Sequence, residues 1–248
     1  HLMDAMPIDF SEELKAWSSQ LESSKKMLLI LEKKLLELPQ GGTAVGSGIN
    51  AHKQFPKHFS QEMTTLMGNK YKCSVAKNFY HEISSQDCSV QLSGELKNLA
   101  LILMKISNDL RWMNSGPLSG IADIELKALQ PGSSIMPGKV NPVIPEAVAM
   151  ASADVIGNDV TISIAAQSGN FQLNVMLPVI AYNLLKSINL LSGSMNVLSK
   201  KAIKTFKVNH KNLEISLSKN PILVTALNPI IGYEKAAAIA KKAYKENR

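Results

Sequence analysis

The sequence predicts an all-α protein, a bundle of long helices. Apolar residues recur at three- and four-residue steps over long segments, and no segment alternates apolar with polar residues as a strand does. Hydrophobic residues make up 45% of the 248 residues but aromatic residues only 5%, so the core is expected to be aliphatic. A chain of this length can bury a sizeable core in one large or two modest domains.

The first long helix is expected over residues 11–38, where residues such as Trp17 and Leu31 recur on one face. The glycine-rich segment 41–48 ends this helix. A shorter helix, rich in lysine and polar residues, is expected over 55–67.

A second long helix is expected over residues 88–113. It is apolar on more than one face, which is typical of a buried helix. Residues 114–137 follow with prolines and glycines that disfavour regular structure. Long loops inside compact domains are often functional, so this connection is a candidate site.

Two more long helices are expected over residues 142–166 and 171–198. Pro178 predicts a kink or a late start in the second, because proline cannot donate a helical hydrogen bond. Short helices are expected near Asn220 and Asn228, each of which precedes a proline. We therefore divide the chain into a central helical bundle, residues 1–207, and part of a helical C-terminal domain, residues 208–248.

Charge and composition exclude several function classes. The net charge is +7, but the lysines are dispersed along amphipathic segments and no nucleic-acid-reading motif is present, so we expect no nucleic-acid partner. The two cysteines and the scattered histidines have no metal-ligand spacing, so neither a metal nor a cofactor is expected. We also expect no membrane span and a reducing compartment.

Residues 132–142 are the most informative segment of the chain. Two hydroxyls (Ser133 and Ser134), a cation (Lys139) and an amide (Asn141) lie in a loop bounded by glycines and prolines. Asn141 is expected to cap the helix that follows, with Pro142 as its first residue. Free N–H groups at a helix start favour carboxylates and developing oxyanions.

This segment resembles the signature loop of the fumarase/aspartase superfamily, and of its class II fumarate hydratases in particular. Further matches follow in family order at residues 1–5, 41–48, 157–159, 168–171 and 223–228. The resemblance implies a lyase that hydrates fumarate reversibly to (S)-malate through an aci-carboxylate intermediate. It also implies a homotetramer with a central helical bundle, in the cytoplasm or, in a eukaryote, the mitochondrial matrix.

The resemblance also implies roles for individual residues. Ser133 matches the catalytic serine that acts as the base. Ser134, Lys139, Val140 and Asn141 match substrate-binding positions, Val140 through its backbone if at all.

His1 matches the histidine that works in the acid half of the reaction, because imidazole titrates near neutral pH. Glu146 matches the glutamate that pairs with this histidine. As a first-turn acid, Glu146 could instead complement the helix dipole.

Two departures from the family pattern bear on activity. The start at His1 suggests a chain that begins inside a longer protein, without the N-terminal domain and the end of the C-terminal domain. The family assembles each active site from three subunits, so residues 1–248 alone are expected to be inactive. Leu118 stands where the family usually has arginine, and the spacing around residues 77–87 is shifted by one residue.

Two alternatives stay open. One is aspartate ammonia-lyase, which uses the same serine loop. The other is a non-catalytic helical module that serves oligomerisation, because helices apolar on several faces need a partner to cover them.

Overall fold

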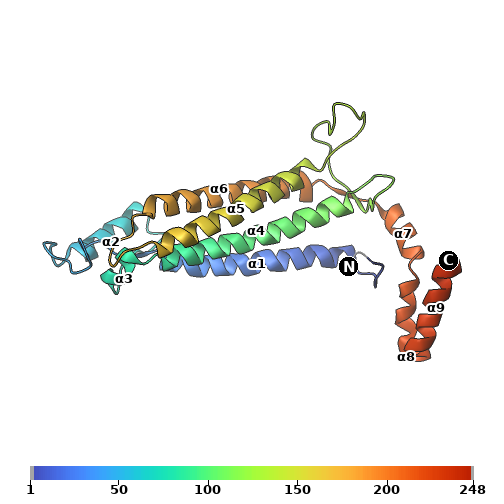
Figure 1. The fold of residues 1–248 in the computed structure, drawn as a ribbon, viewed down its shortest axis with the longest axis horizontal. Coiled ribbons are helices and arrows are strands. Elements are labelled where there is room, and N and C mark those ends of the chain that lie inside the picture. The colour runs from blue at the N-terminus through green and yellow to red at the C-terminus, as the bar shows by residue number, and fades with distance from the viewer. Residues whose placement is uncertain (1–2, 247–248) are drawn as a thin grey trace.

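The computed structural model describes residues 3–246, and most of them are helical. Four long helices lie side by side in an elongated bundle (Figure 1). These helices are α1 (Phe10–Lys34), α4 (Asp87–Met113), α5 (Val143–Gln167) and α6 (Leu177–Leu198). The structure thus confirms the predicted all-α bundle.

The start of α1 follows ordinary capping rules. The Asp9 carboxylate accepts a hydrogen bond from the backbone N–H of Ser11 (2.9 Å), and acidic residues occupy the first turn. The end was predicted too late, because α1 stops at Lys34. Glu37–Leu38 instead form strand β1, which pairs in parallel with β2 (Ser74–Val75).

Short helices lie at the end of the bundle away from the chain termini (Figure 1). Helix α2 (Phe55–Leu66) matches the predicted segment 55–67 closely, whereas α3 (Phe79–Ser84) was not predicted. The side chain of Asn78 caps α3 by accepting a hydrogen bond from the His81 N–H (3.2 Å). Six residues are too few to show a helical period in the sequence.

Helix α6 begins late, as Pro178 predicted. The helix starts at Leu177, with the proline in its first turn, where no backbone N–H is needed. Asn174 holds the preceding turn, because its side-chain amide donates to the carbonyl oxygen of Ala165 (3.0 Å). Its side-chain oxygen accepts from the Met176 N–H (2.7 Å).

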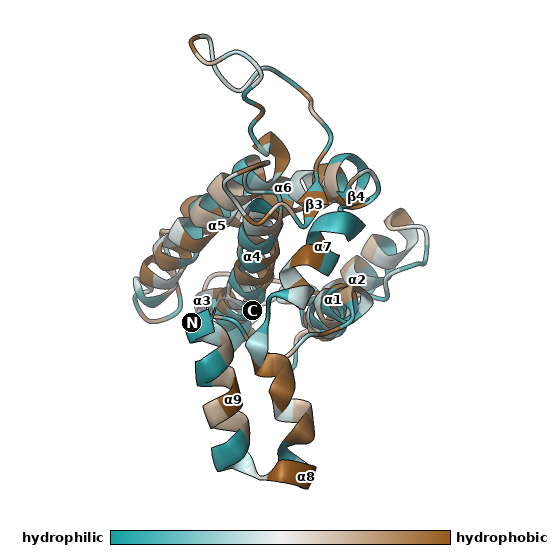
Figure 2. Cartoon of the chain, turned by 90° about the vertical axis from the view of Figure 1, so that its right-hand side faces the viewer, coloured by the Kyte–Doolittle hydropathy of each residue, from teal (hydrophilic) through white to brown (hydrophobic). Residues whose placement is uncertain are grey.

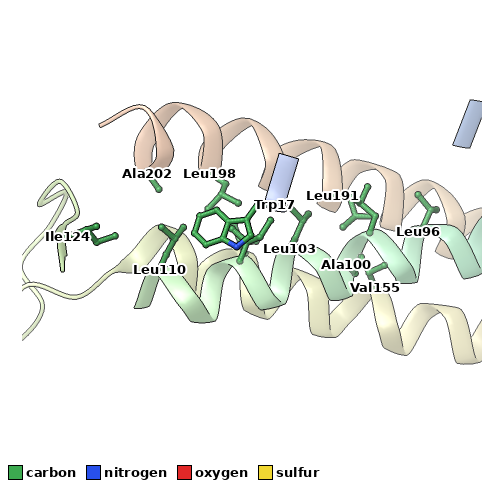
Figure 3. Close-up of a cluster of buried hydrophobic side chains, with 13 residues drawn as sticks. Trp17, Leu96, Ala100, Leu103, Leu110, Ile124, Val155, Leu191, Leu198 and Ala202 are labelled. Carbon is green, nitrogen blue, oxygen red and sulfur yellow. The ribbon is translucent and has the colours of Figure 1, made fainter. Parts of the chain in front are cut away.

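The core runs along the facing sides of the four long helices. Figure 3 shows Trp17 of α1 beside Leu103 and Leu110 of α4, with Leu198 of α6 nearby. Leu103 and Leu110 are at most 1% exposed. As expected from the composition, aliphatic side chains fill most of this core.

A partly buried ion pair joins α4 to α5. The carboxylate of Asp159 on α5 accepts hydrogen bonds from the Ser93 hydroxyl (2.7 Å) and from Lys97 Nζ (2.6 Å), both on α4. The Asp159 side chain is 8% exposed. Buried charges are tolerated when paired and hydrogen-bonded, and the Asp159 carboxylate meets both conditions.

The outward face of α5 and α6 is apolar. Met150, Val160 and Ile164 on α5 and Tyr182 and Leu185 on α6 are each more than half exposed. Figure 2 shows the apolar residues along α5 in brown. By length and composition α5 could cross a membrane, a test that core helices also pass; it packs between α4 and α6.

The segment between α4 and α5 and the C-terminal elements meet at one end of the bundle (Figure 1). Within the predicted loop 114–137, Ile124–Glu125 form strand β3, which pairs antiparallel with β4 (Lys207–Val208). A π-helical turn, η1 (Ser199–Ile203), links α6 to this pair.

The remaining elements extend away from the bundle (Figure 1). They are α7 (His210–Ser218), the 3₁₀ helix η2 (Pro221–Leu227), α8 (Asn228–Ile231) and α9 (Tyr233–Glu246). Helical segments were expected here, but α9, with 14 residues, is longer than predicted. The division between residues 207 and 208 stays a prediction.

Candidate active site

The loop of residues 132–142 is closed at its base by main-chain groups. The Gly132 N–H donates to the carbonyl oxygen of Lys139 (2.8 Å), and the Lys139 N–H donates to the carbonyl oxygen of Met136 (3.3 Å). The side-chain amide of Asn141 donates to the Gly132 carbonyl (3.3 Å). The loop therefore has a defined turn at its base, although it projects from the bundle (Figure 1).

Ser133 lies half-buried inside this turn. Its Oγ accepts two backbone hydrogen bonds, from the N–H groups of Ile135 (3.1 Å) and Met136 (3.0 Å). Both donors point at the oxygen that would carry negative charge if the hydroxyl lost its proton. Hydrogen bonds to a charged form favour that form, so the turn is suited to stabilise a serine alkoxide.

Gly132 is required by the close approach of the two sides of the loop. A Cβ at this position would lie 2.7 Å from the carbonyl oxygen of Lys139 and 2.9 Å from the backbone nitrogen of Asn141. Real Cβ atoms do not approach backbone atoms so closely. A side chain at residue 132 would therefore force the base of the loop open.

Asn141 does not cap α5 as predicted. The helix begins at Val143, Pro142 precedes it as the N-cap, and no side chain there caps the helix. The helix starts one residue too late for Asn141 to be its N-cap, and the Asn141 amide instead donates to the Gly132 carbonyl across the loop. Asn141 therefore joins the two ends of the loop, and its second amide hydrogen is available to another acceptor.

The other predicted residues divide by position. Ser134, Lys139 and Val140 are exposed on the loop, open to a ligand from solvent. Glu146 is half-buried in the first turn of α5, where its backbone N–H donates to Pro142 (3.2 Å). His1 lies outside the described residues, so its predicted pairing with Glu146 stays a prediction.

Asparagines of the α7 region hold the backbone before the loop, and the sequence reasoning missed this role. The Asn209 side chain donates to the carbonyl of Ala122 (3.0 Å), and its backbone N–H donates to the carbonyl of Asp123 (2.8 Å). Asn212 donates to the carbonyl of Ile121. An asparagine before a helix predicts a cap, but nothing local reveals a second partner some ninety residues away.

One carboxyl group at this end of the bundle, that of Asp123, has a shifted pKa. Burial raises the pKa of the Asp123 carboxyl above its usual range. In residues 3–246 no group of three or more His, Cys, Asp or Glu side chains is placed to hold a metal ion. The chemistry suggested by the loop rests on the Ser133 oxygen and its two backbone donors, with Lys139 exposed on the same loop.

Sequence comparison relates the chain to known enzymes. The model of a family described as lyase matches residues 1–157, and that of the fumarase C C-terminus matches residues 223–248. The class II fumarate hydratase 2 of Pseudomonas aeruginosa is 58% identical over all 248 residues, which cover 54% of that protein. The class II fumarate hydratase of Xylella fastidiosa is 55% identical over the same residues, 52% of its length.

Structural comparison agrees. The crystal structure of a class II fumarase from Schistosoma mansoni superposes with a TM-score of 0.97 at 34% identity, covering 100% of this chain and 55% of that one. The chain spans about half the length of the curated relatives it matches. On these grounds the chain belongs to the fumarase/aspartase superfamily of lyases, with class II fumarate hydratases among its relatives.

Proposed function

We propose that the chain carries the catalytic loop of a fumarate hydratase, which adds water reversibly to fumarate to give (S)-malate without a cofactor. The observation that supports this best is the pair of N–H donors at Ser133 Oγ, from Ile135 and Met136. The relatives named class II fumarate hydratase point the same way.

The reaction needs a base, an acid and a group that stabilises negative charge. In the direction from malate to fumarate, Ser133 as an alkoxide takes the proton from the carbon next to a carboxylate. This leaves an aci-carboxylate, and hydroxide then departs with a proton from the acid. A serine hydroxyl is a poor base unless its alkoxide is stabilised, and the two backbone donors meet that need.

The binding roles go to the exposed side of the loop. Lys139 pairs with a substrate carboxylate, and such a charge-assisted bond is stronger than a neutral one. Ser134 and Asn141 donate hydrogen bonds to the substrate, Asn141 through the amide hydrogen that does not hold Gly132. Val140 contributes at most its backbone.

The acid half of the reaction is assigned to His1, working with a bound water. Glu146 pairs with this histidine and tunes its pKa, since a neighbouring carboxylate favours the charged imidazolium. The half-buried place of Glu146 at the start of α5, four residues beyond the loop, is compatible with that role.

Assembly and location follow from the same proposal. The exposed apolar residues of α5 and α6 are suited to lie against other copies of the chain in a homotetramer. The proposed location is the cytoplasm, or the mitochondrial matrix in a eukaryote.

The alternatives are an aspartate ammonia-lyase and a non-catalytic helical module. The relatives named above favour the hydratase over the ammonia-lyase. Because residues 1–248 alone are expected to be inactive in any case, the module is favoured over the hydratase only if the longer protein also folds without turning over either substrate.

The test follows fumarate absorbance during malate dehydration, and in parallel measures ammonia release from aspartate. It is run on residues 1–248 and on a longer protein that contains them. Replacing Ser133 with alanine is expected to lower kcat by about 10³-fold, because a positioned base contributes on that order. Ser84→Ala is the matched control, since within residues 3–246 the Ser84 hydroxyl donates only to the Tyr80 carbonyl in α3.

Ammonia release without malate turnover would reject the hydratase. Malate turnover that survives Ser133→Ala would leave the reaction in place but remove the serine from it. If only the longer protein is active, residues outside 1–248 complete the site.

A further inference from the structure

One stretch of the chain carries positive charge alone. From residue 160 to residue 213 the sequence contains no Asp or Glu. Its lysines are Lys186, Lys200, Lys201, Lys204, Lys207 and Lys211. Lys186 pairs with Asp154 (2.7 Å), whereas the other five are exposed and form no ion pair within residues 3–246.

Most of these lysines lie at the end of the bundle where the serine loop is rooted. Lys200 and Lys201 are on η1, and Lys204 directly follows it. Lys207 is on β4, paired with β3, and Lys127 follows β3 in the chain. We call Lys127, Lys200, Lys201, Lys204 and Lys207 the lysine patch.

The patch reaches the foot of the loop. Lys127 and Lys201 line one small cavity together with Pro142 and Val143, where the loop passes into α5. Figure 1 shows the end of α6 and the loop at the same end of the bundle, and Figure 2 labels β3 and β4 at this end. A charge in this patch therefore acts close to the loop without belonging to it.

The acids on the neighbouring elements are partly paired with other lysines. Glu12 pairs with Lys15, and Glu13 and Asp109 pair with Lys105. The other acids on these elements, Asp9, Asp123, Glu125, Glu146 and Glu214, form no ion pair within residues 3–246 with the five lysines of the patch. Glu125 lies opposite Lys207 in the strand pair, but their side chains form no ion pair. The patch is therefore a local cluster of unpaired positive charge among the described residues.

Such a cluster of charge matters for a doubly charged substrate. Clefts lined by one sign of charge raise association rates by about 10- to 1,000-fold, and the effect falls steeply with ionic strength. Fumarases are among the enzymes that approach the diffusional limit, where encounter controls kcat/KM. A dicarboxylate dianion is the ligand class that a lysine patch beside this loop would attract.

We propose that the lysine patch steers dicarboxylate dianions to the serine loop and so raises kcat/KM without touching the reacting atoms. This inference rests on the proposed function. In this proposal Lys139 binds the substrate directly, whereas the patch lysines act at a distance through their electric field. The patch should therefore affect encounter with the substrate and leave the chemical step unchanged.

The test compares the salt dependence of kcat/KM in the form of the protein that turns over malate. The wild type is expected to lose about tenfold in kcat/KM as the Debye length shrinks from ~30 Å at 0.01 M salt to below ~10 Å. The variant K127Q/K200Q/K201Q/K204Q should start lower, change less than about threefold over the same range, and keep kcat. Circular dichroism checks its fold.

The control variant K26Q/K33Q/K57Q/K72Q removes four exposed lysines, from α1, from α2 and near β2, that form no ion pair with any residue from 3 to 246. It makes the same change in net charge, so it should keep the wild-type salt dependence. A patch variant with the wild-type slope, or a wild type insensitive to salt, overturns the steering. Absence of turnover in every form rejects the proposed function itself.

Discussion

The side chain of Asn220 makes two hydrogen bonds that serve different parts of the chain. Its Oδ1 accepts from the Ile222 N–H (3.0 Å) and caps η2, while its Nδ2 donates to the carbonyl oxygen of Ala5 (2.7 Å). Ala5 is four residues from His1, the predicted acid. Asn220 thus links the start of η2 to the segment that follows His1, the proposed acid, in the chain.

Replacing Asn220 with aspartate separates these two roles. Aspartate caps a helix as well as asparagine does, but it cannot donate to Ala5. We expect faster hydrogen exchange over residues 3–9 and little change in residues 221–231, with a stability loss of about 1 kcal/mol or less. Hydrogen exchange read by mass spectrometry measures both segments.

The matched control for that variant is Asn78→Asp. Asn78 caps α3 through its oxygen, and its amide makes no hydrogen bond to another segment in residues 3–246. Unchanged exchange over residues 3–9 in Asn220→Asp would mean that the bond to Ala5 does not restrain this segment.

Adding a methyl group at Gly132 should open the base of the loop. The new Cβ would lie 2.7 Å from the Lys139 carbonyl oxygen, so the donors at Ser133 would move. We expect Gly132→Ala to lower kcat by about 10²-fold, because a shift of about 1 Å can cost that much. Initial rates of malate dehydration and a thermal melt measure the two effects.

Gly94→Ala provides the comparison. Gly94 lies within α4, where a Cβ would meet nothing within 4 Å. Alanine in a helix interior should raise stability by roughly 0.5–1 kcal/mol and leave the rate unchanged. If Gly132→Ala is already unfolded at the temperature of the assay, its lower rate reflects global unfolding and not a local change in the loop.

Removing the partner of Asp159 should destabilise the bundle. Lys97→Met leaves a carboxylate that is 8% exposed with the Ser93 hydroxyl as its hydrogen-bond donor. Breaking a buried pair costs several kcal/mol, and because Lys97 itself is 41% exposed we expect about 2 kcal/mol. Urea unfolding measures the difference.

The same substitution at Lys186 separates burial from charge. Lys186 Nζ lies 2.7 Å from Asp154 Oδ1, but Asp154 is 42% exposed, so Lys186→Met should cost less than about 1 kcal/mol. Equal losses in the two variants would show that burial of the acid does not set the cost.

His81 should make the corner between α3 and α4 sensitive to pH. Its Nε2 lies 3.0 Å from Asp87 Oδ2 and its Nδ1 lies 3.0 Å from Glu82 Oε1. The hydrogen bond to Asp87, above all, raises the pKa of His81 from its ordinary 6.5. The stabilisation is therefore fully present below pH 6.5 and is lost as the pH rises through the higher folded pKa.

Thermal melts at low and high pH test this expectation. His81→Gln should lower stability at about pH 6 by roughly 0.5 kcal/mol or less, since solvent screens the pair, and should have no effect at about pH 9. His58→Gln is the control, because its ring contacts the neutral amide of Gln54 (3.3 Å). An equal loss at both pH values would exclude a protonated His81 as the cause.

The long helices could be predicted because each repeats its apolar period many times. The strands could not, because Glu37–Leu38 and Ile124–Glu125 are too short to alternate and pair with residues far along the chain. Asn141 shows the same limit within the loop. Its local context favours a helix cap, but α5 begins one residue too late for that role, and the Asn141 amide donates to the carbonyl of Gly132, nine residues away.

The loop around Ser133 could be recognised from its residue types and order. Its two N–H donors could not, because they depend on backbone angles that residue types alone do not specify. Only the folded turn shows that Ser133 Oγ accepts two backbone hydrogen bonds and that residue 132 has no room for a Cβ. The role of His1 stays a prediction.

The hydrogen bond from the Gly132 N–H to the Lys139 carbonyl joins main-chain atoms, so the shape of the loop does not depend on the side chains at its tip. Because backbone atoms close the turn, side chains at residues 134–136 could change without unfolding it. An enzyme built this way could acquire selectivity for a different dicarboxylate by substitutions at the tip while its serine keeps its surroundings. Directed evolution confined to those three positions would therefore explore new substrates on an intact scaffold.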